Sequence, residues 1–243
     1  MKQTTKQSEG PEAEYQALLQ AGELQPDIAQ RRAIHALERL HHELFAYSEV
    51  TNRGSQRSFL SWWPFRALTR NTNNLTAPKG IYLYGGVGRG KSMLMDMFFS
   101  ATPITQKRRV HFHEFMLEVH ARLKAINEHS VQKRKRESRY LSGDNDPILL
   151  VAQEIANETV LLCFDELHVT DIADAMVLTR LFDKLFELGV VVVATSNRLP
   201  DDLYKNGLNR QRFLPFIEQI KEKLHIIALD GPIDYRYNRL KGA

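Results

Sequence analysis

The chain has 243 residues, of which 43% are hydrophobic, and its formal net charge is +4. This length allows one α/β domain with a helical addition, and so small a charge does not by itself imply a nucleic-acid partner. No apolar run reaches the roughly 18 residues that a membrane span needs, and the start of the chain lacks the apolar run of a signal peptide. Its single cysteine, Cys163, can form no internal disulfide, so we expect a reducing cytoplasm.

The first fifty residues predict an N-terminal helical segment, residues 1–50. A short amphipathic pattern over residues 11–22 ends at Gly22, and Pro26 and Asp27 then open a longer helix with apolar residues at helical spacing. Such a helix pair before the first strand can pack over a nucleotide. Gln25 or Gln30 would then contact the adenine edge; the alternative, which we favour, is that both are solvated.

Residues 51–78 predict a linker rich in serine, asparagine, arginine and threonine. The segment contains both tryptophans of the chain, Trp62 and Trp63, beside arginines. An apolar, aromatic patch of this kind either docks a partner or a membrane surface, or packs against the body of the protein.

A buried strand, a glycine-rich loop and an apolar helix are predicted over residues 81–99. The loop matches the pattern G-x-x-x-x-G-K-[ST] in full, with the residues Gly85, Gly86, Val87, Gly88, Arg89, Gly90, Lys91 and Ser92. Its glycines let backbone N–H groups approach phosphate oxygens, while Lys91 reaches the β- and γ-phosphates and the Ser92 hydroxyl takes a position on Mg²⁺. The positive end of the helix faces the same anion. A plain glycine-rich turn would not require all of these parts together, so we predict a site for a nucleoside triphosphate and Mg²⁺.

A second strand is expected over residues 109–113 and an amphipathic helix over residues 114–127. The segment 128–146 follows, with five positive charges between positions 133 and 139. These charges either contact phosphates or acidic protein, or form a solvated surface loop, which we favour.

The second half of the predicted site comes after a helix over residues 147–157. An apolar strand, residues 160–166, ends in Asp165 and Glu166. Behind a complete phosphate loop, Asp165 is expected to bind Mg²⁺ and Glu166 to polarise the attacking water. A further helix is expected over residues 171–188, before a buried strand that ends at Asn197. Ligand chemistry gathers at that edge of a parallel sheet, so Asn197, with Thr195 as the second choice, is expected to orient the water or touch the γ-phosphate.

The remaining elements are a helix that opens at residues 207–213 and extends to Lys223, and a last strand over residues 224–229. The order of elements predicts an α/β fold, a P-loop NTPase of the AAA+ (additional-strand) class. It comprises a five-stranded parallel sheet with helices on both faces. We assign residues 79–231 to this ATPase core.

Three stretches carry a resemblance to a known family. They are the phosphate loop, the Asp165–Glu166 strand with residues 170–176, and residues 194–197 with the segment 201–210; residues 111–116 and 234–236 also match. In these stretches the chain resembles the ZapE family of AAA+ ATPases, which includes mitochondrial AFG-type relatives. Family members continue well past residue 236, so residues 232–243 are expected to begin a truncated C-terminal region.

The resemblance implies an ATP-hydrolysing cell-division protein that remodels or destabilises FtsZ ring polymers. It further implies a homo-oligomer in the cytoplasm, with a peripheral contact at the inner membrane or division site. On the side where AAA+ subunits meet, Arg212, and Arg210 as second choice, are expected to act on the ATP of a neighbouring subunit. Mitochondrial relatives are instead linked to the turnover of respiratory-chain subunits.

Other functions compete with this interpretation. A P-loop kinase would transfer phosphate to an acceptor, and a helicase-loader-like ATPase would bind single-stranded nucleic acid through residues 133–139. We do not expect nucleic acid as the partner. We do not expect a GTPase, because the guanine motif Asn/Thr-Lys-x-Asp occurs nowhere in the chain.

Overall fold

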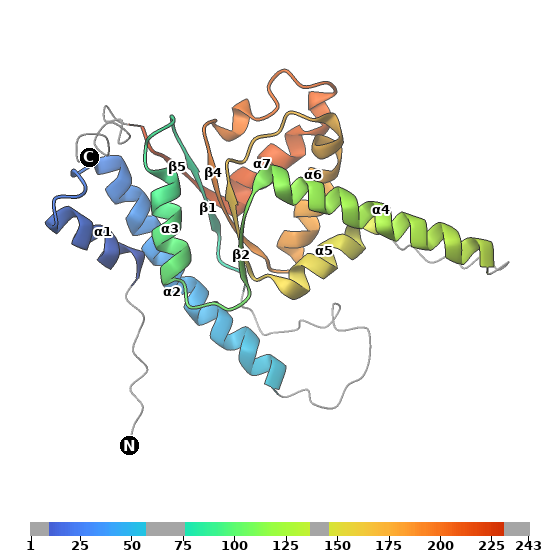
Figure 1. Ribbon diagram of the computed structural model, residues 1–243, viewed down its shortest axis with the longest axis horizontal. Helices are drawn as coiled ribbons and strands as arrows, with labels where there is room; N and C mark the ends of the chain where they lie inside the picture. The colour runs from blue at the N-terminus through green and yellow to red at the C-terminus, as the bar shows by residue number, and fades with distance from the viewer. Residues whose placement is uncertain (1–9, 57–75, 137–145, 231–243) are drawn as a thin grey trace.

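The computed structural model describes residues 10–56, 76–136 and 146–230. Within these ranges five parallel strands form one sheet in the spatial order β2-β3-β4-β1-β5 (Figure 1). The strands are β1 (Gly80–Tyr84), β2 (Lys107–His111), β3 (Leu161–Asp165), β4 (Val191–Ser196) and β5 (Leu224–Ala228). The predicted fold class, a parallel sheet of five strands with helices on both faces, is confirmed.

Alternating side chains of the strands divide the core into two layers, as expected for successive residues that point to opposite faces of a sheet. Ile81, Cys163 and Val193 lie in one layer, whereas Tyr82 and Phe164 lie in the other. Buried residues occupy both faces, which explains why β3 and β4 appear in the sequence as continuous apolar runs.

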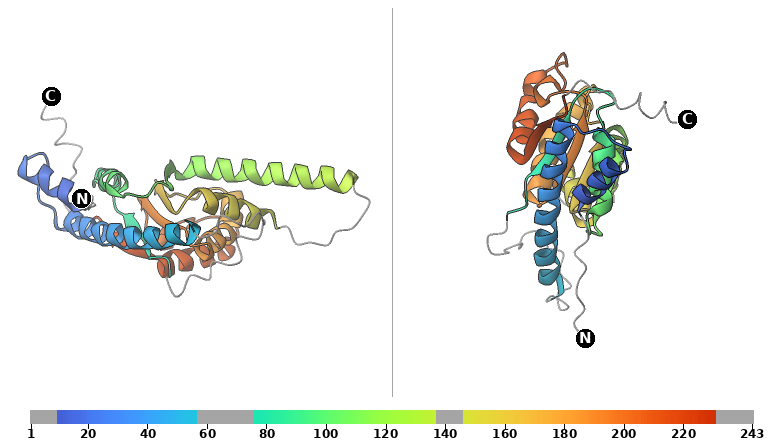
Figure 2. Two further views of the ribbon diagram at one scale, coloured as in Figure 1. Left: turned by 90° about the horizontal axis from the view of Figure 1, so that it is seen from below. Right: turned by 90° about the vertical axis from the view of Figure 1, so that its left-hand side faces the viewer.

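Helices cover both faces of the sheet. The face with Ile81 carries α1 (Pro11–Gln20), α2 (Ile28–Gln56) and α3 (Lys91–Ala101). The opposite face carries α4 (Phe112–Arg136), α5 (Pro147–Glu158), α6 (Ile172–Glu187) and α7 (Leu214–Lys223). Figures 1 and 2 show α4 projecting away from the rest of the molecule. No helix of the described ranges has both the length and the apolar character that crossing a bilayer requires.

Several element boundaries differ from the prediction. The strand expected over residues 109–113 lies two residues earlier, because Phe112, Phe115 and Met116 follow helical spacing and their side chains pack into the core from α4. Helix α2 continues to Gln56, six residues into the segment predicted to be a linker. Its start is as predicted, since the Asp27 side chain accepts hydrogen bonds from the first free N–H groups of the helix.

The helix expected from residue 207 is shorter than predicted. Two 3-10 helices, η1 (Pro200–Asp202) and η2 (Arg210–Arg212), precede α7, which begins at Leu214. The second residue of α7 is Pro215, which is favoured in the first turn because its missing N–H has no partner there anyway. Asn209, just before η2, has a φ of 57°, a left-handed conformation that interrupts a regular helix.

Candidate nucleotide-binding site

The sheet order brings the predicted site residues together. Strands β3, β4 and β1 are neighbours, and one part of the site lies at the end of each: Asp165–Glu166, Asn197 and the phosphate loop. Tyr84 of β1 pairs with Ser196 of β4, so both strands end level with each other. Because all strands are parallel, these three segments share one edge of the sheet, as ligand sites of open α/β sheets do.

The phosphate loop adopts backbone conformations that explain its glycines. Gly88 has a φ of 79° and Gly90 a φ of 83°, both in the left-handed region that side chains other than glycine rarely adopt. Gly90 also lies against α2, because a Cβ atom there would be 2.6 Å from the Gln30 Nε2 atom. The loop then enters α3 at Lys91, so the free N–H groups at the start of this helix belong to the motif.

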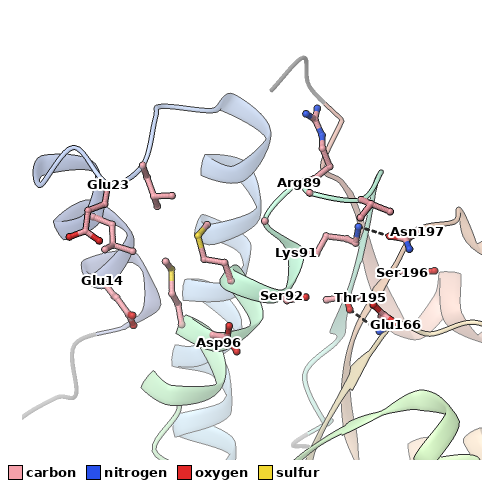
Figure 3. Close-up of a pocket in the computed structure, with 17 residues that line it drawn as sticks. Glu14, Glu23, Arg89, Lys91, Ser92, Asp96, Glu166, Thr195, Ser196 and Asn197 are labelled. Atoms are coloured by element: carbon pink, nitrogen blue, oxygen red, sulfur yellow. Dashed lines mark hydrogen bonds between the residues drawn. The ribbon is translucent and has the colours of Figure 1, made fainter. Parts of the chain in front are cut away.

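A cavity of about 780 Å³ lies between the phosphate loop and α1 (Figure 3). Its polar end contains Lys91, Ser92, Glu166 and Asn197. Its other end lies between α3 and α1 with the turn after it, where Leu18, Leu24, Met93 and Met97 line the wall. Glu14 and Glu23 also line this end (Figure 3). This combination, an anion-binding end and an end lined by apolar side chains with two carboxylates, suits a molecule with both phosphates and a flat ring that carries hydrogen-bond donors.

Lys91 lies at the centre of the polar end. Its Nζ atom donates to Gly85 O, Gly86 O and Asn197 Oδ1, each at 2.7 Å. Burial lowers the pKa of Lys91, while the Glu166 carboxylate opposes that shift. The Lys91–Asn197 contact, drawn in Figure 3, joins β4 to the phosphate loop across the cavity.

Glu166 follows β3 in a conformation that is rare for its residue type. Its φ is 56°, and its backbone N–H donates to Thr195 Oγ1 at 3.1 Å. Left-handed residues other than glycine cluster at functional sites, where the surrounding structure holds them. The side chain is exposed and lines the cavity (Figure 3). Thr195, our second choice for contacting the ligand, therefore supports the backbone of Glu166 in this structure.

Asp165 is buried behind the cavity wall and has a partner that sequence reasoning missed. Arg109 Nε donates to Asp165 Oδ2 at 2.6 Å, and Arg109 Nη2 donates to Asp165 Oδ1 at 3.2 Å. A third nitrogen, Nη1, donates to Asp96 of α3. Partial burial alone would lower the pKa of Arg109, but the bonds to Asp165 and Asp96 outweigh it and the pKa is raised.

These groups fit Mg²⁺ by their chemistry. The Ser92 hydroxyl and the carboxylates of Asp96 and Asp165 are hard oxygen donors, which Mg²⁺ prefers. Ser92 and Asp96 line the cavity, whereas Asp165 does not. Asp165 as a metal ligand stays a prediction. Asp96 was identifiable in principle, since it lies four positions after Ser92 and so on the same face of a helix.

The preferred interpretation of Gln30 is wrong. Its side chain is fully buried, and its Nε2 atom donates to Arg89 O at 3.0 Å, whereas its Oε1 atom has no partner within the described ranges. Gln30 therefore braces the phosphate loop from α2. Gln25 is exposed, and neither glutamine lines the cavity.

The two arginines expected to act on a neighbouring subunit differ in their surroundings. Arg210 Nη2 donates to Asp201 O at 2.6 Å, which ties this side chain to η1. Arg212 is exposed, and its side chain forms no hydrogen bond or ion pair with the part of the chain that the structure describes. Neither arginine lines the cavity of its own subunit. Their role in catalysis stays a prediction.

Some predicted features lie outside what the structure describes. These are the Trp62–Trp63 patch, the side chains of residues 133–139 and the segment 232–243. Among the described residues, no group of three histidine, cysteine, aspartate or glutamate side chains is placed to hold a metal ion by itself.

Comparison with known proteins identifies a family. The model of the AFG1-like ATPase family matches residues 9–243. Lactation elevated protein 1 homolog B of Danio rerio is 42% identical over 94% of this chain and 50% of its own length. Cell division protein ZapE of Escherichia coli (strain K12) is 40% identical over 98% of this chain and 59% of its own length. The chain thus spans about half of the length of these relatives.

A solved structure of another protein shares the fold of this chain. The solved structure of a DNA replication initiation factor covers 90% of this chain and 51% of its own, with a TM-score of 0.50 and 13% identity. At this level of identity the similarity shows a shared fold alone.

Proposed function

The chain belongs to the AFG1-like ATPase family, and from this premise we propose that it hydrolyses Mg²⁺–ATP to remodel a protein partner in cell division. It is a P-loop ATPase of the AAA+ class by family and fold. The observation that carries the proposal is the meeting of Lys91, Glu166 and Asn197 at the polar end of one cavity.

The proposed binding mode assigns one task to each end of the cavity. The triphosphate lies along the phosphate loop, where Lys91 exchanges its carbonyl partners for phosphate oxygens. The adenine ring packs at the apolar end between α1 and α3. A volume of about 780 Å³ lies within the range of about 300–1,000 Å³ that is typical of small-molecule sites.

The proposed chemistry relies on residues at the ends of β3 and β4. Glu166 holds the attacking water and accepts its proton, and Asn197 orients that water or contacts the γ-phosphate. Bound Mg²⁺ would supply stabilisation of charge on the phosphoryl oxygens, with Ser92 and Asp165 as the residues that hold it. Thr195 keeps the Glu166 backbone in place.

We further propose that the active form is a homo-oligomer in which Arg212 reaches the ATP of a neighbouring subunit. The support is its exposed, unengaged side chain within the described part of the chain, in contrast to Arg210, which is held by Asp201. A guanidinium that arrives from outside stabilises charge on the γ-phosphoryl group only once subunits assemble. Hydrolysis would then depend on assembly.

The proposed partner is the FtsZ ring, reached at the division site by a peripheral contact with the inner membrane. The support is the similarity to a bacterial relative that is a cell division protein. This chain spans 59% of that relative, so the coupling of hydrolysis to a partner is tested separately from hydrolysis itself.

The test uses the purified chain with preformed FtsZ polymers and measures two quantities in one tube. Phosphate release from ATP, dependent on Mg²⁺ and abolished in Lys91→Ala, supports the ATPase. A fall in sedimented FtsZ with ATP, absent with Glu166→Gln, supports the partner. If ATP is hydrolysed while the sedimented fraction stays constant, the FtsZ proposal is wrong and the ATPase proposal stands.

A further inference from the structure

Arg109 forms an ion-pair cluster beside the residues that are expected to hold Mg²⁺. It lies on the edge strand β2, and its guanidinium contacts both carboxylate oxygens of Asp165 and one oxygen of Asp96. The cluster therefore joins three elements: β2, β3 and α3. Two of these elements carry the residues expected to hold Mg²⁺, Ser92 on α3 and Asp165 on β3.

The position of this positive charge matters because Asp96 is one helical turn after Ser92. Residues four apart on a helix lie on the same face, so Asp96 and Ser92 both line the cavity. The guanidinium lies between Asp96 and the buried Asp165, immediately beside the edge where a divalent cation would bind. A cation that uses Asp165 must share its carboxylate with Arg109.

Bidentate contact also fixes geometry. A carboxylate offers about four lone-pair directions, and the planar fork of arginine occupies two of them while it prevents rotation of the group. Within the described ranges no other group donates a hydrogen bond to the Asp165 carboxylate, so its remaining directions can serve a metal or its water. Lysine could not do this, because an ammonium is a point charge without a fork.

Resting on the proposed Mg²⁺–ATP site, we propose that Arg109 is a positioning residue that orients Asp165 and sets how much Mg²⁺ the nucleotide complex requires. Its charge repels the incoming metal, so the site fills only at a Mg²⁺ concentration higher than the carboxylates alone would need. Asp96 has the opposite effect, since it draws part of the Arg109 charge away from Asp165 and adds a negative charge beside Ser92. The two residues thus tune one equilibrium in opposite directions.

A purely structural role for Arg109 would predict something else. Loss of a brace between β2, β3 and α3 would lower stability and weaken nucleotide binding at every Mg²⁺ concentration. Arg108 provides the matched control, because it is the next residue of β2 and donates two hydrogen bonds to Glu118 on the opposite side of the strand. Arg108→Gln removes an equivalent ion pair from the same strand without touching the cavity.

The experiment measures binding of a fluorescent ATP analogue in the Glu166→Gln background, first in EDTA and then across a Mg²⁺ titration. We expect Arg109→Gln to lower the Mg²⁺ concentration at half-effect by about tenfold, the size of a screened charge–charge interaction over a few ångströms. Asp96→Asn should raise that concentration, and Arg108→Gln should leave it unchanged. Arg109→Lys keeps the charge that opposes Mg²⁺ but loses the fork that holds Asp165, so the Mg²⁺ concentration at half-effect should not fall below that of the parent.

The outcomes separate this inference from the proposed function. If the parent does not bind the analogue in any condition, the nucleotide site itself is wrong. If the parent binds it with a Mg²⁺ dependence that Arg109→Gln and Asp96→Asn leave unchanged or shift in the same direction, the role of Arg109 is wrong. Melting temperatures of all variants identify any that fails to fold. If Arg109→Gln is such a variant, Asp96→Asn still tests the inference, because an unchanged or lowered Mg²⁺ requirement in Asp96→Asn would contradict it.

Discussion

Replacing Gly90 by alanine tests how the phosphate loop is held against α2. Gly90 has a φ of 83°, and a residue with a Cβ atom pays roughly 1–2 kcal/mol in the left-handed region. The new Cβ would also be 2.6 Å from Gln30 Nε2, and the Gln30 side chain cannot move into solvent because it is fully buried. Breaking its bond to Arg89 O leaves a buried amide unsatisfied, which costs roughly 1–3 kcal/mol more. The expected loss in free energy of unfolding is therefore about 2–5 kcal/mol.

Gly22→Ala is the matched control for that substitution. Gly22 has a φ of 74°, and a Cβ atom there would have no neighbour within 4 Å. Its replacement should cost only the conformational part, about 1–2 kcal/mol.

Urea denaturation of the two variants and of the parent measures the difference directly. The same substitution in a Gln30→Ala background isolates the contact. There, Gly90→Ala should lower the free energy of unfolding by no more than Gly22→Ala does in the parent, because the clashing amide is gone. If Gly90→Ala costs the same in both backgrounds, or no more than Gly22→Ala in the parent, Gln30 does not brace the loop. Nucleotide affinity measured on the same samples would show whether a displaced loop still binds phosphate.

Three further substitutions test the catalytic assignments. Lys91→Ala should abolish nucleotide binding, since it removes the main positive charge of the cavity; submicromolar ATP affinity by calorimetry would contradict the assignment. Glu166→Gln should bind ATP like the parent while single-turnover hydrolysis falls by about 10²-fold or more, the loss expected for a positioned base; equal losses of binding and hydrolysis would make Glu166 structural. Arg212→Ala should keep ATP binding and lose turnover by roughly 10³-fold or more. Its activity should return on mixing with Lys91→Ala subunits, and mixed assemblies that form but stay inactive would exclude action across an interface.

Local sequence patterns were sufficient for the phosphate loop and for the strands around it. The motif over residues 85–92 requires glycines at left-handed positions, and Gly88 and Gly90 occupy them. Likewise, an apolar run with no periodicity identified β3 and β4, because both faces of each strand are buried. The predicted boundary between β2 and α4 was misplaced because strand and helix signals overlap there. Strand β2 passes directly into α4 at Phe112, with no glycine or proline between them.

The sequence by itself determined the class of the protein, the residues of the phosphate loop and the acidic pair after β3. These follow from short-range rules, since each motif performs its chemistry within a few consecutive residues. Only the tertiary structure decided which side chains support them. Arg109 is 56 positions from Asp165 and Gln30 is 59 positions from Arg89, and nothing in the local sequence around either residue marks its partner. Such pairs arise from the order of strands in the sheet and the packing of α2 and α3 on one face, because side chains distant in the chain meet only when the whole core has formed.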